Sequence, residues 1–205
     1  MAWYEKSYRR HLADMHIEDW DPEFLRDFSP ETYLENLKLA HIESPMIYLQ
    51  SHVGYSYFPT ASGKTHAAMT SDPSPVERLI ELCHREGMSV VGYYSLIYNT
   101  WAHDAHPEWR MFDRSGKSVR ERTPHYRYGF CCPNNAGYRE FLKTQIDEIA
   151  ARFRLEGMFY DMLFWPDLCA AYIHIHACDI TQRIIQQCIK PLSACRKIRG
   201  KRRCS

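Results

Sequence analysis

The residue best placed to do chemistry is Asp161, which directly follows the apolar run from Gly157 to Tyr160. A carboxylate at the end of a buried strand is a candidate for attack or proton transfer, and Trp165 nearby would supply an apolar wall. An N-cap or a solvated loop acid would explain the position equally well. The aromatic residues around Asp161 favour a functional role.

Two histidines lie at the ends of the first and second predicted strands. His16 stands in His-Ile-Glu-Asp-Trp, and His52 stands in Gln-Ser-His-Val-Gly-Tyr. Imidazoles at strand ends can hydrogen-bond sugar hydroxyls or act as acid and base, although a single histidine is more often structural. Their recurrence at two strand ends is the informative observation.

A third strand end carries amide and aromatic side chains, in the run from Tyr93 to Trp101. Asn99 offers two donors and an acceptor, and Trp101 offers a flat ring. Such groups suit a polyhydroxylated ring, which has apolar C–H faces and a polar rim. Core packing accounts for Tyr93, but it does not easily account for Trp101 in a polar stretch.

These side chains need strands and helices to position them, and three helices are indicated by their start signals. The signals are Ser29-Pro30-Glu31, Ser74-Pro75-Val76-Glu77 and Asn134 or Asn135, each ahead of apolar residues at helical spacing. We expect Gly87 to end the second helix and Gly157 to end the third.

Each helix leads into a short apolar segment that is typical of a buried parallel strand. A weaker, mostly polar candidate strand precedes the first helix. The four predicted strands are Arg10 to His16, Met46 to Leu49, Ser89 to Ser95 and Gly157 to Tyr160.

Alternating strands and helices predict an α/β fold, either an open doubly wound sheet or a (β/α) barrel. Two aromatic-rich segments, 51–72 and 96–134, leave the carboxyl ends of strands, where both architectures bind ligands. No Gly-rich phosphate loop follows a strand, which disfavours a nucleotide-binding sheet. We therefore expect a barrel.

Charge and cysteine usage narrow the classes of partner. The chain has 205 residues and a formal net charge of +1, which gives no reason to expect nucleic acid or an anionic membrane as partner. No signal peptide and no long apolar run is present, so we expect a cytoplasmic protein with reduced thiols. The last 35 residues hold eight Lys and Arg against a single acid, Asp179, together with half of the cysteines.

Several segments together resemble the hypothetical glycosyl hydrolase 6 family, which is related to α-L-fucosidase barrels. The resemblance covers about residues 3–169 and rests on the segments 11–20, 50–55, 92–97, 106–110 and 159–166. It implies hydrolysis of a glycosidic bond with retention, a carbohydrate substrate and no cofactor or metal, with Asp161 as nucleophile. The residues then expected to hold the sugar are His16, His52, Tyr94, Asn99, Trp101 and Trp165.

The chain departs from such enzymes in its number of strands. A complete barrel has eight strands, whereas four are counted up to Asp161, and the acid/base residue of the family comes from a later strand. We expect residues 1–169 to form the amino-terminal half of a barrel and the basic residues 170–205 to be foreign to it, from a truncated or out-of-frame gene end. A half barrel exposes two sheet edges, which favours self-association or inactivity.

Two rival functions belong to other classes. The first is a carbohydrate-binding or remnant protein without catalysis. The second is a metal- or nucleic-acid-binding role for the tail, where Cys169, His174, His176 and Cys178 lie within ten residues. Their spacing matches no common zinc module, and a short basic end is usually only solvated.

Overall fold

A computed structural model describes residues 2–113 and 115–163 of the chain. Trp165, the candidate zinc ligands and the expected domain boundary near residue 170 lie outside the described residues. Four parallel strands form one sheet, and in their order across it they are β1 (Arg10–Leu12), β2 (Ser44–Tyr48), β5 (Val91–Ser95) and β6 (Gly157–Asp161).

The strands alternate with three main helices, as the start signals predicted. These are α1 (Pro30–Leu39), α2 (Pro75–Arg85) and α5 (Ala136–Arg152). Ser29, Ser74 and Asn135 cap them by accepting hydrogen bonds from backbone N–H groups in the first turn. Gly87 has φ +75° just after α2, as the predicted C-terminal signal requires.

The expectation that Gly157 ends the third helix is wrong. Helix α5 ends at Arg152, and Phe153 already has an extended backbone with φ −108° and ψ 137°. Gly157 is instead the first residue of β6, where it pairs with Val91 of β5.

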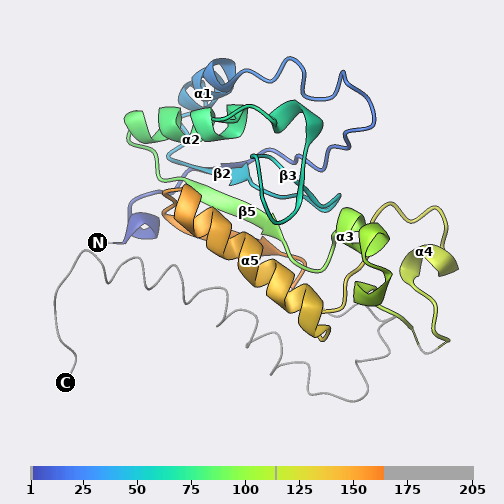
Figure 1. The fold of residues 1–205 in the computed structure, drawn as a ribbon. Helices are drawn as coiled ribbons and strands as arrows, with labels where there is room; N and C mark the ends of the chain where they lie inside the picture. The colour runs from blue at the N-terminus through green and yellow to red at the C-terminus, as the bar shows by residue number, and fades with distance from the viewer. Residues whose placement is uncertain (1, 114, 164–205) are drawn as a thin grey trace, which may run out of the picture.

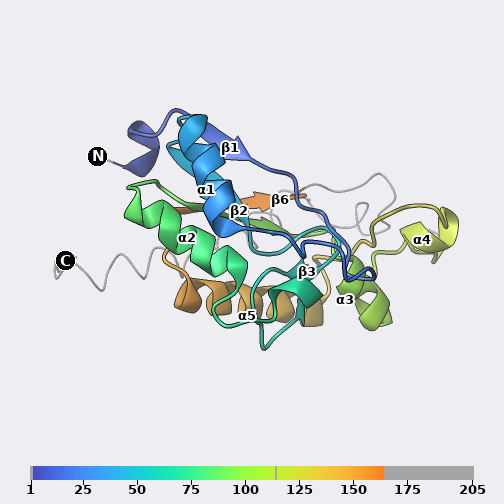
Figure 2. The same ribbon diagram turned by 90° about the horizontal axis from the view of Figure 1, so that it is seen from above.

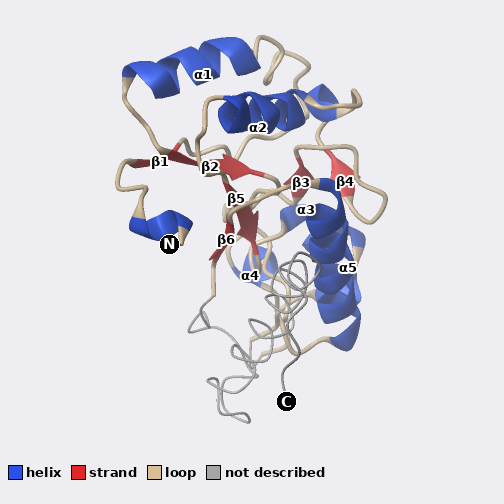
Figure 3. Cartoon of the chain, turned by 90° about the vertical axis from the view of Figure 1, so that its left-hand side faces the viewer, coloured by secondary structure: helices blue, strands red, loops and turns tan. Residues whose placement is uncertain are grey.

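The helices cover the outer side of a curved sheet. Figure 3 shows the strands along an arc from β1 to β6, with α1, α2 and α5 on its outer side. Helices α1 and α2 pack side by side (Figure 1 and Figure 2). Helix α5 lies on the outer side of the sheet, in front of β5 in Figure 1. Leucine, isoleucine and aromatic side chains from both layers fill one continuous core. A curved parallel sheet with helices outside is the arrangement of part of a (β/α) barrel.

The two segments predicted as long loops contain short elements of their own. The segment after β2 holds β3 (Tyr55–Ser56), β4 (Lys64–Thr65) and the 3-10 turn Ala67–Met69, and the segment after β5 holds α3 (Thr100–Ala105), the 3-10 turn Pro107–Trp109 and α4 (Val119–Arg122). A further 3-10 turn, Trp3–Glu5, precedes β1. Figure 1 shows α3 and α4 beyond the carboxyl end of β5, so this segment lies over that end of the sheet.

No helix in the described part of the chain is both long and apolar enough to span a membrane.

Candidate functional site

The carboxyl ends of the four strands bring titratable side chains from distant parts of the chain together. His16 follows β1, His52 follows β2, Tyr93 and Ser95 belong to β5, and Asp161 ends β6. Ser95 pairs in register with Asp161, and Tyr93 pairs with Tyr48 of β2. Parallel pairing therefore sets the cluster, because it aligns the ends of neighbouring strands at one edge of the sheet.

Asp161 is a partly exposed acid of the cluster. Its side chain is 31% exposed, and both carboxylate oxygens accept hydrogen bonds. The Tyr93 hydroxyl donates to Oδ2 at 2.5 Å, and the backbone N–H of Met162 donates to Oδ1 at 2.7 Å. Two donors on two oxygens hold the carboxylate plane in one orientation.

The second donor depends on an unusual backbone. Met162 has φ +58°, in the left-handed region that residues with a side chain rarely adopt. This conformation turns the chain at the end of β6 while the N–H of Met162 reaches the carboxylate of the preceding residue. Backbone strain of this kind persists where the surrounding structure fixes it, and it is common at functional sites.

The two histidines form a stacked pair. Their ring centroids are 3.6 Å apart with 25° between the planes, and the backbone N–H of His52 donates to Nδ1 of His16 at 3.1 Å. Nε2 of His52 faces Oδ2 of Asp161 at 3.8 Å. The His52 ring therefore lies beside the candidate nucleophile Asp161, and the His16 ring stacks on the His52 ring.

Both imidazoles are held in the neutral form. Burial is the main cause, and the neighbouring His16 a further one, that together lower the pKa of His52 to about 4 against the opposing effect of Asp161. Burial also lowers the pKa of His16, although the Asp14 carboxylate acts in the opposite direction. At neutral pH each ring thus offers one N–H donor and one lone pair.

Two tyrosines support the two acids of the cluster. The Tyr48 and Tyr93 rings stack with centroids 3.8 Å apart. Tyr48 donates to Asp14 at 2.9 Å, as Tyr93 does to Asp161. Burial is the main cause that raises the pKa of both hydroxyls, so they act as donors at any physiological pH.

A side chain from the segment after β5 reaches the same cluster. The Arg127 guanidinium donates to the backbone carbonyl of His16 at 2.5 Å and lies over the Tyr128 ring, 5.1 Å from its centroid. The Tyr128 ring in turn meets the His52 ring edge-on, with centroids 5.1 Å apart. Arg127 therefore ties the long segment to the strand ends.

The structure brings Asp161, His16 and His52 together, but it places other predicted sugar-binding residues elsewhere. Tyr94 points to the opposite side of the sheet from Tyr93, where its hydroxyl donates to Gln145 of α5. Tyr94 is fully buried there, so its position gives no support for contact with a sugar.

Asn99 and Trp101 belong to the start of α3. Asn99 is fully buried and caps this helix by accepting from the N–H of Ala102 at 2.9 Å. The Trp101 ring packs beside Phe141 of α5, with centroids 5.8 Å apart. Both positions therefore have structural explanations.

Four residues of the cluster were not singled out as functional from the sequence: Asp14, Tyr48, Tyr93 and Ser95. Tyr93 packs in the core as expected, but its hydroxyl also serves Asp161. Strand register carries the missing signal, because the last residues of adjacent parallel strands lie beside one another.

Ser95, His52 and Asp161 have the composition of a hydrolase triad, but their geometry is different. Ser95 is fully buried, and its hydroxyl donates to the carbonyl of Tyr98 at 2.8 Å. A nucleophilic serine must be accessible and must give its proton to the imidazole. The half-exposed Asp161 is therefore the better candidate nucleophile of the three.

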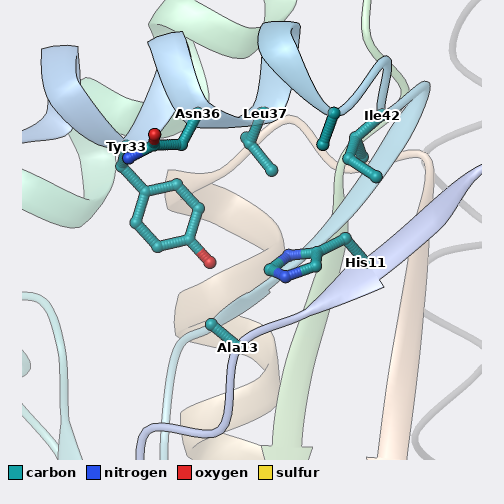
Figure 4. A pocket seen from close by; sticks show the side chains of 7 residues that line it. His11, Ala13, Tyr33, Asn36, Leu37 and Ile42 are labelled. Carbon is teal, nitrogen blue, oxygen red and sulfur yellow. The ribbon is translucent and has the colours of Figure 1, made fainter.

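The described residues contain no group of three side chains suited to hold a metal ion. A pocket of about 170 Å³ lies away from the cluster, between β1 and α1. Figure 4 shows His11 of β1 facing Tyr33 and Leu37 of α1 across it. Its lining is mostly apolar and includes none of the residues around Asp161.

One protein family matches most of the chain. The family model described as hypothetical glycosyl hydrolase 6 matches residues 29–162, more than half of the chain and a range that includes His52 and Asp161. No curated protein sequence matches the chain.

Solved structures share the fold at low sequence identity. An α-L-fucosidase isoenzyme 2 from Paenibacillus thiaminolyticus is 21% identical with a TM-score of 0.80, over 92% of this chain and 31% of that one. An α-L-fucosidase from Bacteroides thetaiotaomicron is 19% identical with a TM-score of 0.56, over 85% and 34%. A hypothetical protein from Ruminiclostridium thermocellum is 11% identical with a TM-score of 0.66, over 89% and 92%.

These similarities confirm the predicted fold, part of a (β/α) barrel. The chain spans about a third of the length of the two fucosidases that it matches.

Proposed function

Because the chain belongs to the hypothetical glycosyl hydrolase 6 family, we propose that it acts on a glycosidic bond, with Asp161 as the catalytic nucleophile. The observation that carries this proposal is the fixed and accessible carboxylate at the end of β6. Tyr93 and Met162 hold its two oxygens, and the neutral His52 lies beside it. By likeness to the two fucosidases, the proposed substrate is an α-L-fucoside.

The proposed reaction retains configuration and has two steps. A carboxylate oxygen of Asp161 attacks the anomeric carbon, the glycosidic C–O bond breaks, and the leaving oxygen takes a proton from a second carboxylic acid, which lies about 5.5 Å from the Asp161 carboxylate. Water then hydrolyses the glycosyl ester and gives its proton to that second group. The products are the free sugar and the free alcohol.

The second carboxyl group is assigned to none of the described residues. Asp14 is the other acid of the cluster, but its Oδ1 accepts from Tyr48 and lies 3.2 Å from Nε2 of His16. We propose that Asp14 orients these two side chains, and that the acid/base residue belongs to another part of the complete barrel.

His16, His52 and Tyr93 are proposed to surround the sugar ring beside Asp161. Neutral imidazoles suit sugar hydroxyls, because each ring can accept from or donate to an O–H without a charge. Tyr94, Asn99 and Trp101 remain predictions, which their present positions do not support.

A panel of nitrophenyl glycosides tests the proposal, with the fucoside and galactoside first. We expect turnover of one glycoside by the wild-type chain and its loss in Asp161→Asn, while the exposed Asp147→Asn on α5 serves as the matched control. A binding measurement for the same sugar separates the alternatives. Sugar binding without turnover in both the wild type and Asp161→Asn would favour a non-catalytic carbohydrate-binding protein.

We also propose that the chain associates with itself through the edges of the sheet. Among the described strands, β1 and β6 each have a neighbour on one side only. Leu12 and Phe159 on these strands are 37% and 41% exposed. Sedimentation should show a dimer or larger species that Phe159→Lys converts toward monomer, because a charge on an edge strand opposes pairing.

The domain boundary near residue 170 remains a proposal based on composition. Residues 171–205 hold eight Lys and Arg but a single acid, Asp179. Limited proteolysis read by mass spectrometry should leave a protected fragment that ends near residue 170. Equal cleavage throughout the chain would contradict the boundary.

A further inference from the structure

Ser95 ends β5, which lies between β2 and β6 in the sheet. It is 0% exposed and pairs in register with Asp161. The hydroxyl has two partners, Nδ1 of His52 at 2.8 Å and the carbonyl oxygen of Tyr98 at 2.8 Å. The single hydroxyl proton can be donated to only one of these two partners.

The chemistry of the carbonyl decides where this proton goes. A carbonyl oxygen only accepts, so the Ser95 hydroxyl donates to Tyr98. The contact of Ser95 with His52 then needs a donor on the imidazole, which places the proton of the neutral ring on Nδ1. Nε2 of His52 is left with a lone pair.

We propose that Ser95 is a positioning residue that fixes His52 in the tautomer with a proton on Nδ1 and a lone pair on Nε2. The opposite tautomer would set two acceptors 2.8 Å apart, unless Ser95 released the Tyr98 carbonyl inside the core. Burial makes either change unfavourable, because water does not reach the abandoned group.

This tautomer makes Nε2 of His52 a hydrogen-bond acceptor. Nε2 and Oδ2 of Asp161 then face each other at 3.8 Å as two acceptors. A substrate hydroxyl placed between them would donate to one of them, whereas a methoxy or fluoro group has no proton to donate. Resting on the proposed function, we infer that a sugar must carry a free hydroxyl at this point.

Histidine-selective ¹⁵N NMR of the whole chain tests the tautomer directly and requires no turnover. We expect the protonated-nitrogen signal of His52 on Nδ1 at pH 7, where the low pKa of about 4 keeps the ring neutral. Comparison with His52→Gln identifies the signal among the other histidines. A proton on Nε2 of the wild-type ring would overturn the proposal, whatever the enzyme's activity.

Two serine variants separate positioning from packing. Ser95→Ala removes the acceptor of Nδ1–H, so His52 should move toward the Nε2–H form, while Ser95→Thr keeps a hydroxyl and should keep the wild-type tautomer. Ser44→Ala is the matched control, because Ser44 is equally buried and its hydroxyl donates to the Ser89 carbonyl at 2.7 Å rather than to a histidine. An unchanged tautomer in a folded Ser95→Ala protein would contradict the role of Ser95.

Activity gives a separate readout. For any glycoside that the wild-type chain turns over, Ser95→Ala should lower kcat/KM by about tenfold, the factor given by one ordinary hydrogen bond. Replacing each substrate hydroxyl in turn by fluorine should show one position where the wild type loses this factor and Ser95→Ala does not. A shifted tautomer with no turnover of any glycoside would support the role of Ser95 and count against the proposed function alone.

Discussion

Tyr93 of β5 donates a 2.5 Å hydrogen bond to Oδ2 of Asp161 on the neighbouring strand β6. The two side chains point to the same side of the sheet, although Asp161 pairs in register with Ser95 rather than with Tyr93. Residues two apart on a strand share a face, so the pairing and the hydrogen bond are consistent. This contact orients the acid on which the proposed chemistry depends.

Removing the Tyr93 hydroxyl should affect turnover more than stability. Hydrogen bonds to charged groups contribute about 1.5–3 kcal/mol, so Tyr93→Phe should lower kcat/KM by roughly 10- to 150-fold. Water can replace the lost donor at the partly exposed Asp161, which limits the effect on unfolding. Steady-state kinetics and urea unfolding measure the two effects.

Tyr94→Phe is the matched control for that experiment, with the opposite expectation. It leaves the buried Gln145 carbonyl without its tyrosine donor, which should cost about 1–3 kcal/mol of unfolding free energy and leave kcat nearly unchanged. If Tyr94→Phe reduced turnover as strongly as Tyr93→Phe, the assignment of faces would be wrong.

The buried histidines predict a loss of stability in acid. His52 has a native pKa of about 4 against 6.5 in the unfolded chain, so above pH 6.5 both states hold the neutral ring. Between pH 6.5 and 4 the unfolded state binds more protons, and stability falls. His16 acts in the same direction.

Urea unfolding at pH 7 and pH 5 measures this effect. The wild type should lose more unfolding free energy over this interval than His52→Gln, which lacks the titrating ring. An equal loss in both proteins would show that His52 does not carry the pH dependence.

The left-handed backbone at Met162 predicts which substitutions the site tolerates. Asparagine adopts positive φ readily, whereas a β-branched residue does not. Met162→Val should therefore unfold with about 1–2 kcal/mol less free energy than Met162→Asn, although both lose the thioether contacts. Denaturant unfolding compares the two variants, and equal free energies of unfolding would show that the backbone at Met162 is not strained.

Much of the fold could be predicted from the sequence, because its signals are local. The caps at Ser29 and Ser74 and the apolar runs at β2, β5 and β6 each depend on neighbouring residues. The strand ends then located Asp161, His16 and His52, which the structure brings together.

The choice between Tyr93 and Tyr94 shows where local signals fail. Strand β5 is buried on both faces, so hydrophobicity does not reveal which face meets the active end of the sheet. The positions of Asn99 and Trp101 could not be predicted for a different reason. Their polar surroundings begin the short helix α3, whose packing on α5 depends on tertiary contacts.

Mass spectrometry after incubation with 2-deoxy-2-fluoro-α-L-fucosyl fluoride tests the role of Asp161 most directly. Attack by Asp161 would expel fluoride and leave a slowly hydrolysed glycosyl ester, because the fluorine at C2 destabilises the oxocarbenium-like transition state of both steps. The account predicts one added fluorofucosyl group on the peptide that contains Asp161, and none in Asp161→Asn. An adduct on another carboxylate, with Asp161 unmodified, would contradict it.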